Sequence, residues 1–133
     1  MNMNGNDIAL ITNTLNSCMV AMDNGDTEWF ADCYTEDGEC TIIKANATKT
    51  GRDELKGLCS FLYSKFSHCK HWEGNISVRS CESINQCTNI SYWKAISDNE
   101  IVSTGIHRDV LVKCDNEWKI KSRVIEHTYS KPI

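Results

Sequence analysis

The spacing of the apolar residues changes near residue 70, and this change limits the possible folds more than any other feature of the chain. Before it, apolar side chains recur three and four residues apart, which is typical of amphipathic helices. After it, they alternate with polar ones, which predicts strands at about 70–82, 86–97, 101–114 and 117–128. The only proline is Pro132, so no interior element is forced to break. Helices followed by a meander of strands predict an α+β fold with helices packed on one face of a bent, mostly antiparallel sheet.

The helical half divides into three segments. The first, 7–22, can be capped by Asp7 and can end at Asn24-Gly25, where glycine supplies a left-handed terminus. A second helix, capped by Asp26 or Thr27, is expected to stop at Asp37-Gly38. The side chains that we expect it to bury are Trp29, Phe30, Cys33 and Tyr34.

A short strand at 39–45 and a third helix from Gly51 to about Ser67 complete the first half of the chain. In the second half, Gly74 and Gly105 interrupt predicted strands and indicate bulges, which a strongly curved sheet needs. Short polar turns at 83–85, 97–99 and 115–117 separate the strands.

Length and charge exclude several classes of protein. A chain of 133 residues is expected to form one domain, 1–133, with one core and room for a modest cavity. The net charge of −4 and the lack of a Lys/Arg cluster argue against a nucleic-acid partner. The apolar runs are too short to span a bilayer, so no membrane partner is expected.

The N-terminal segment has no basic region followed by an apolar block, so it does not look like a signal peptide, and a cytoplasmic location is expected. In that compartment the 8 cysteines are expected to be reduced. Cys18, Cys33 and Cys59 fall on predicted apolar helix faces, where a thiol acts as a small hydrophobe. No C-x-x-C pair occurs, so a structural zinc site is not expected. His68 and His71 could form a metal pair, but no third ligand is evident and strand alternation points the two residues to opposite faces, so no metal site is expected.

Five short motifs occur along the chain in an order that resembles a known group of proteins. They are Met22-Asp23-Asn24-Gly25-Asp26, Tyr34-Thr35-Glu36-Asp37-Gly38, Gly51-Arg52-Asp53-Glu54-Leu55, His71-Trp72-Glu73-Gly74-Asn75, and Gly105-Ile106-His107-Arg108-Asp109-Val110-Leu111-Val112 with Trp118-Lys119-Ile120-x-x-Arg123. With the order of the elements, they resemble the SnoaL-like and scytalone-dehydratase-like branch of the NTF2-like superfamily. This resemblance implies a cone in which three N-terminal helices pack on a strongly curved sheet that encloses a pocket. It also implies a homodimer formed through the outer face of the sheet, with the strand around Tyr92-Trp93 contributing.

The resemblance can be carried over residue by residue. A ketosteroid-isomerase-like site would need its tyrosine and its aspartate at Cys18 and Ile42, which cannot perform those roles. The scytalone-dehydratase-like site matches better, with its aspartate at Asp23 and its first histidine at His71. Its second histidine has no counterpart in 91–96. Its pocket asparagine corresponds to His107, and the tyrosine before its aspartate corresponds to Met22.

Three residues are therefore the candidate catalytic groups. His71 is suited to general acid/base chemistry at physiological pH, although a strand histidine can also simply bond to the backbone. Asp23 can orient and stabilise an imidazolium, or it can be an ordinary turn residue. For His107 two arguments conflict. Strand alternation alone places the aliphatic face inward and His107 outward, whereas the resemblance places it in the pocket.

The candidate substrate-binding residues are Tyr34, Trp72, Tyr92, Asp109 and Phe30. A buried tyrosine hydroxyl needs a partner and can bind a substrate oxygen, while Asp109 can instead hold Arg123. Trp29 and Phe66 are expected in the core, and His68 and His127 at the surface.

Two classes of function follow. The first is a cofactor-free lyase or isomerase, dehydratase-like or cyclase-like, that acts on a small hydrophobic oxygenated molecule. In it, His71 is the acid/base, Asp23 its charge partner, and His107 or a tyrosine polarises a substrate oxygen. The second class is non-catalytic: a ligand-binding or assembly domain, or the small subunit of a ring-hydroxylating dioxygenase. The separation of Asp23 from His71, and the presence of an open pocket, distinguish the two classes.

Overall fold

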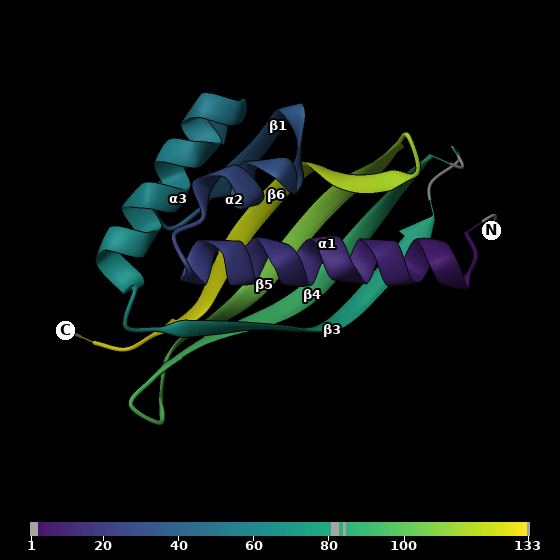
Figure 1. Ribbon diagram of the computed structural model, residues 1–133. Helices are drawn as coiled ribbons and strands as arrows, with labels where there is room; N and C mark the ends of the chain where they lie inside the picture. Colours follow the sequence, from purple (N-terminus) through teal and green to yellow (C-terminus); the bar gives the residue numbers. More distant parts are fainter. Residues whose placement is uncertain (1–2, 81–82, 84, 133) are drawn as a thin grey trace.

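The computed structural model describes residues 3–80, 83 and 85–132 and is α+β, with a curved, unclosed sheet. Its elements follow in the order α1 Gly5–Asp23, α2 Thr27–Asp32, β1 Tyr34–Ile42, β2 Ala47–Thr50, α3 Arg52–Phe66, β3 Lys70–Ser80, β4 Gln86–Ser97, β5 Glu100–Cys114 and β6 Glu117–Ser130. The sheet has 6 strands in the order β2-β1-β6-β5-β4-β3. α1 crosses one face of this sheet, and α2 and α3 lie toward one end of it (Figure 1).

The strands of the second half pair as an antiparallel meander, as predicted. Two hairpins turn on residues with positive φ, Asp98-Asn99 and Asp115-Asn116, as expected for tight turns whose twist matches that of the strands. The pairing register shifts between Gly74 and Ser77 and again between Thr104 and Gly105, which confirms the expected bulges. The predicted turn at 83–85 includes Ile84, which lies outside the described residues, as do Cys81 and Glu82.

The caps of the first two helices come from short polar side chains. Asn4, not Asp7, is the N-cap of α1, and the two form a capping box in which the Asn4 side chain accepts from the Asp7 N–H. The prediction that Asp7 caps the helix is therefore wrong, because α1 begins earlier and Asp7 is its third residue. Asp26 caps α2 by accepting from the Trp29 N–H at 3.1 Å. Gly25 follows α1 with a φ of +66°, as predicted.

The second helix is shorter than predicted. It ends at Asp32, and the chain continues as β1, which pairs in parallel with β6. The amide of Ile120 donates to the Cys33 carbonyl, so pairing with a distant strand overrides the local helical spacing. Trp29 lies within α2 but is 40% exposed, so its expected place in the core is wrong.

The expected burial of Phe66 is also wrong, since this residue at the end of α3 is 44% exposed. The strand β2 was not predicted because it is a polar and largely exposed edge strand without an apolar alternation. The core lies between α1, α3 and the inner face of the sheet. Its largest buried apolar side chains are Ile11, Leu15, Phe30, Leu55, Leu111, Trp118 and Ile120.

Candidate functional site

A cavity of about 420 Å³ opens between the inner face of the sheet, the last turns of α1 and the second half of α3. Its wall is mostly apolar: Met19 and Met22 come from α1, and Phe61, Leu62 and Phe66 come from α3. On the sheet side, the polar lining residues are His71, His107 and His127, with Trp93 among them, together with Ser103 and Lys44. Such a cavity, apolar with a few convergent polar groups, is typical of a small-molecule site.

Asp23 and His71 meet at the edge of this cavity. Asp23 is the last residue of α1, and His71 is the second residue of β3. One carboxylate oxygen of Asp23 lies 2.6 Å from His71 Nδ1, and the other accepts from the His71 backbone N–H at 2.8 Å. The two contacts fix both the position and the ring orientation of the histidine. With Nδ1 bound to the carboxylate, Nε2 is the nitrogen available to a ligand.

A second histidine–carboxylate pair stands deeper in the sheet. His107 Nδ1 lies 2.8 Å from Glu73 Oε2, and both side chains are almost fully buried. The expectation from alternation that His107 points outward is therefore wrong. The face that carries Cys87, Asn89 and Ser91 on the neighbouring strand is the buried one, so the aliphatic residues beside His107 lie on the outer face.

Glu73 was missed by the sequence analysis, although a signal for it existed. It lies two residues after His71 on the same strand, so alternation places both on one face. A buried carboxylate needs partners, and the sequence does not show where they are. They come from β4, β5 and β6, which only the sheet brings together.

The partners of Glu73 form a buried polar network. Arg123 donates from Nη2 to Glu73 at 3.0 Å and from Nε to Asp109 at 2.7 Å. Ser91 donates to Glu73, and Asn89 donates to Asp109 and to Ser91. Each carboxylate is thus held by a guanidinium and by neutral donors, which is what buried charges require.

The network sets the charges of its members. Burial acts to raise the pKa of Glu73, but the hydrogen bond from His107 and the charge of Arg123 outweigh it, so the pKa lies below its ordinary value. For His107, burial and the nearby Arg123 charge outweigh the attraction of Glu73 and lower the pKa. At neutral pH Glu73 is therefore ionised and His107 is a neutral imidazole.

Trp93 lies among the three histidines of the cavity wall. Its indole stacks on His107 with ring centroids 5.8 Å apart, meets His127 edge-on at 5.0 Å and approaches His71 at 6.3 Å. The indole lies over Gly105 on the next strand, where a Cβ would come within 2.5 Å of it. His127 was expected at the surface, and this is wrong because β6 turns it into the cavity beside Trp93.

None of the five predicted substrate-binding residues lines this cavity. Phe30 and Tyr34 are buried in the core, where their rings pack at 5.4 Å, and Asp109 binds Arg123. Trp72 and Tyr92 are half exposed, because each alternates with an inward-facing neighbour, His71 or Trp93.

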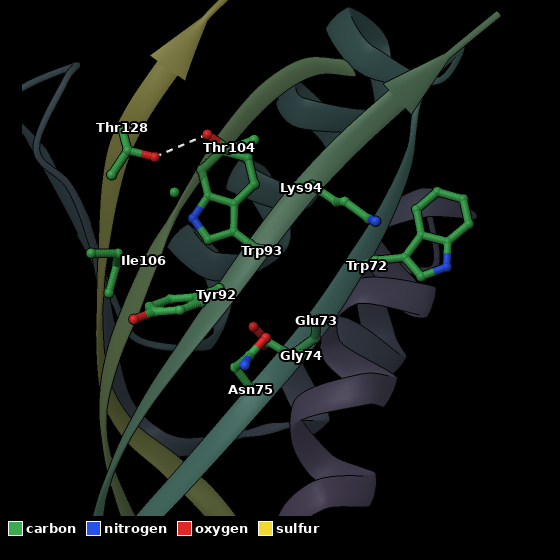
Figure 2. A pocket seen from close by; sticks show the side chains of 11 residues that line it. Trp72, Glu73, Gly74, Asn75, Tyr92, Trp93, Lys94, Thr104, Ile106 and Thr128 are labelled. Atoms are coloured by element: carbon green, nitrogen blue, oxygen red, sulfur yellow. Dashed lines mark hydrogen bonds between the residues drawn. The ribbon is translucent and has the colours of Figure 1, made fainter. Parts of the chain in front are cut away.

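Trp72 and Tyr92 instead border an open groove of about 580 Å³. Figure 2 shows the strands between this groove and α1, so it lies on the outer face of the sheet. Its other side chains include Lys94, Ile106 and the hydrogen-bonded pair Thr104–Thr128.

Over the described ranges, no group of three or more His, Cys, Asp or Glu side chains is placed to hold a metal ion. The seven cysteines that the structure describes are all free thiols, and six of them are buried. In the same part of the chain, no helix is long and apolar enough to cross a membrane.

Comparison with known proteins agrees with this architecture. The family profile of the SnoaL-like domain matches residues 5–124. A cystatin-like-fold protein of unknown function from Nostoc punctiforme superposes with a TM-score of 0.89 at 18% identity, covering 99% of this chain and 98% of that one. A scytalone dehydratase-like protein from Novosphingobium aromaticivorans gives 0.81 at 25% identity, covering 96% and 87%.

The hexachlorocyclohexane dehydrochlorinase LinA-type3 from Novosphingobium barchaimii also superposes, with a TM-score of 0.81 at 15% identity, covering 94% of this chain and 88% of that one. No curated protein matches this sequence.

Proposed function

This chain belongs to the SnoaL-like family, and from that premise we propose that it is a cofactor-free lyase or isomerase with His71 as its general acid/base. The fold is one that carries a small-molecule pocket of the lyase and isomerase type. The proposal rests on one observation: the Asp23 carboxylate holds both the ring and the backbone of His71 at the edge of an apolar cavity.

The geometry assigns different tasks to the two residues. An ionised carboxylate can only accept, so it selects the tautomer of His71 that carries hydrogen on Nδ1. Nε2 then has a free electron pair for a proton of the substrate. Asp23 does not touch the substrate in this arrangement, so it is a positioning residue that also stabilises the imidazolium once the proton has moved.

The reaction proceeds by removal of a proton from carbon. His71 Nε2 takes a C–H proton from a carbon next to an activating group, and the electron pair of that bond forms a carbon–carbon double bond. In a dehydration, a hydroxyl on the neighbouring carbon leaves with its bonding electrons and takes the proton from the imidazolium, giving water. In an isomerisation, the proton returns to a different carbon of the same molecule.

The test begins with a panel of hydroxylated aromatic and polyketide-like compounds, with conversion followed by mass spectrometry. For any compound that the protein converts, His71→Ala is expected to lower the rate by about 10²–10⁴-fold, the usual contribution of a general base. Asp23→Asn is also expected to lower it at least about 10²-fold, because an amide forces one donor–donor contact or the wrong tautomer.

His68→Ala is the matched control, because His68 is exposed just before β3 and lies outside the cavity wall. Unchanged turnover in His71→Ala would refute the proposal. Binding of panel compounds without any conversion would favour the non-catalytic ligand-binding alternative instead.

A further inference from the structure

The cavity presents a hydrogen-bond acceptor, not a donor, at His107. Glu73 is ionised and lies against Arg123 at 3.0 Å, so its carboxylate can only accept hydrogen bonds. The contact of 2.8 Å between Glu73 Oε2 and His107 Nδ1 therefore requires hydrogen on Nδ1. In a neutral imidazole the other nitrogen, Nε2, is then without hydrogen.

His107 stays neutral because of where it lies. Its side chain is 2% exposed, and the Arg123 guanidinium belongs to the same buried network, so a second positive charge there is opposed. Glu73 favours the charged form but already neutralises Arg123 together with Asp109. The imidazole is thus an acceptor whose hydrogen position is set by the network behind it.

The acceptor nitrogen is available to a ligand. His107 lines the cavity, and no side chain or backbone group among the described residues bonds to its Nε2. Stacking on Trp93 holds the imidazole plane, since the two rings are inclined by only 20°. Nε2 consequently has a fixed direction and is not free to turn toward a different partner.

The charges around the cavity indicate a neutral ligand. Asp23, Glu73 and Asp109 are three carboxylates behind the wall, whereas Arg123 in the buried network and Lys44 on the wall are the two Lys/Arg cations that the described residues place there. Their sum is negative, so an anionic ligand would be repelled across a medium that screens charge poorly.

We propose that this cavity takes a neutral, largely apolar compound that donates a hydroxyl hydrogen to His107 Nε2. His107 is then a specificity-determining residue that selects hydroxyl-bearing compounds over ketones of the same skeleton. This role differs from the oxygen-polarising one expected from the sequence, because polarising a carbonyl requires a donor. The inference rests on the proposed use of the cavity for a small molecule but not on catalysis.

The test compares two probes that share a skeleton, 2-tetralol and 2-tetralone, by titration calorimetry. Only the alcohol can donate, and one neutral hydrogen bond contributes about 1 kcal/mol, so the wild-type protein is expected to bind the alcohol about 5–10-fold more tightly. Equal binding, or tighter binding of the ketone, would overturn the inference.

The substitution Glu73→Gln is designed to move the imidazole hydrogen of His107 from Nδ1 to Nε2. Arg123 Nη2 needs an acceptor, so the amide oxygen of Gln is held toward it, and the amide NH₂ falls against His107 Nδ1. His107 must then carry its hydrogen on Nε2 and becomes a donor. Because an alcohol and a ketone can both accept a hydrogen bond from Nε2, the ratio of their affinities is expected to fall to about 1 in this variant.

Glu117→Gln is the matched control, because the same chemical change is made at an exposed position in the β5–β6 hairpin. It should keep the preference of the wild-type protein. If Glu73→Gln does not fold, ¹⁵N NMR of histidine-labelled wild-type protein decides the question, since it distinguishes the two tautomers of His107 directly. Hydrogen on Nε2 of His107 would refute the inference.

The titrations are repeated in His71→Ala, where the proposed function predicts turnover that is slower by about 10²–10⁴-fold. If the wild-type protein converts no compound of the panel but prefers the alcohol, the result supports this inference and counts against the lyase proposal. If the wild-type protein converts a compound but binds the alcohol and the ketone equally, the result supports the lyase proposal and counts against this inference. The failure of one proposal can therefore be told from the failure of the other.

Discussion

Gly105→Ala should destabilise the protein strongly, because β5, β6 and Trp93 meet at this position without room for a methyl group. A Cβ at Gly105 would lie 2.0 Å from the Glu126 carbonyl oxygen and 2.5 Å from the Trp93 indole. Real Cβ contacts do not come this close, so both neighbours must move. The carbonyl belongs to the paired backbone of β6 and cannot move without separating the two strands.

The expected cost follows from these two displacements. Forcing one extra carbon into a well-packed core costs about 1–3 kcal/mol, and moving the strands apart adds the loss of ladder hydrogen bonds at about 1 kcal/mol each. A loss of about 3 kcal/mol or more is therefore expected. For a chain of this length it corresponds to a fall in Tm of roughly 10 °C.

The assay is urea denaturation followed by circular dichroism and tryptophan fluorescence. Gly74→Ala and Gly57→Ala are the matched controls, because a Cβ at either position meets no atom within 4 Å. Gly57 lies inside α3, so alanine there should stabilise by about 0.5–1 kcal/mol. A loss below about 1 kcal/mol in Gly105→Ala would refute the argument that rigid backbone crowds this position.

Four further predictions concern other parts of the molecule. Arg123→Met should lose about 3–5 kcal/mol at pH 7, since it removes the guanidinium that both buried carboxylates contact, and urea melts should show stability recovering as acid protonates them. Hydrogen bonds from Trp118 and Lys113 lower the pKa of Asp7, so its contribution is complete above about pH 4 and is lost as the pH falls through the folded pKa. Asp7→Asn should therefore be less stable than wild type at pH 7, with the gap closing below pH 4 in pH-dependent melts. Of the described thiols, only Cys114 should react rapidly with a disulfide reagent in the folded protein, because the other six are buried. Homodimerisation through the outer sheet face stays a prediction, and Tyr92→Arg should shift the sedimentation of any dimer toward monomer.

The order of elements, apart from the edge strand β2, was predictable because it depends on local patterns. The 3.6-residue spacing of α1, the period of two after residue 70 and the turn residues at 97–99 and 115–117 each act over a few neighbours. The errors occurred where distant pairing decides. α2 ends at Asp32 because β1 joins β6, and that strand lies more than 70 residues away along the chain.

For the candidate site too, some features were predictable from the sequence and others depended on pairing between distant strands. The family resemblance singled out Asp23, His71 and His107 and placed the first two in a shared role, while their residue types showed that they are suited to acid/base chemistry. The burial of Glu73, the inward direction of His107 and the place of His127 beside Trp93 depended on the assembled sheet. A sequence specifies which groups can donate, accept or ionise. Which of them are neutral, paired or free toward the cavity is decided only when folding removes water and brings β3, β5 and β6 together.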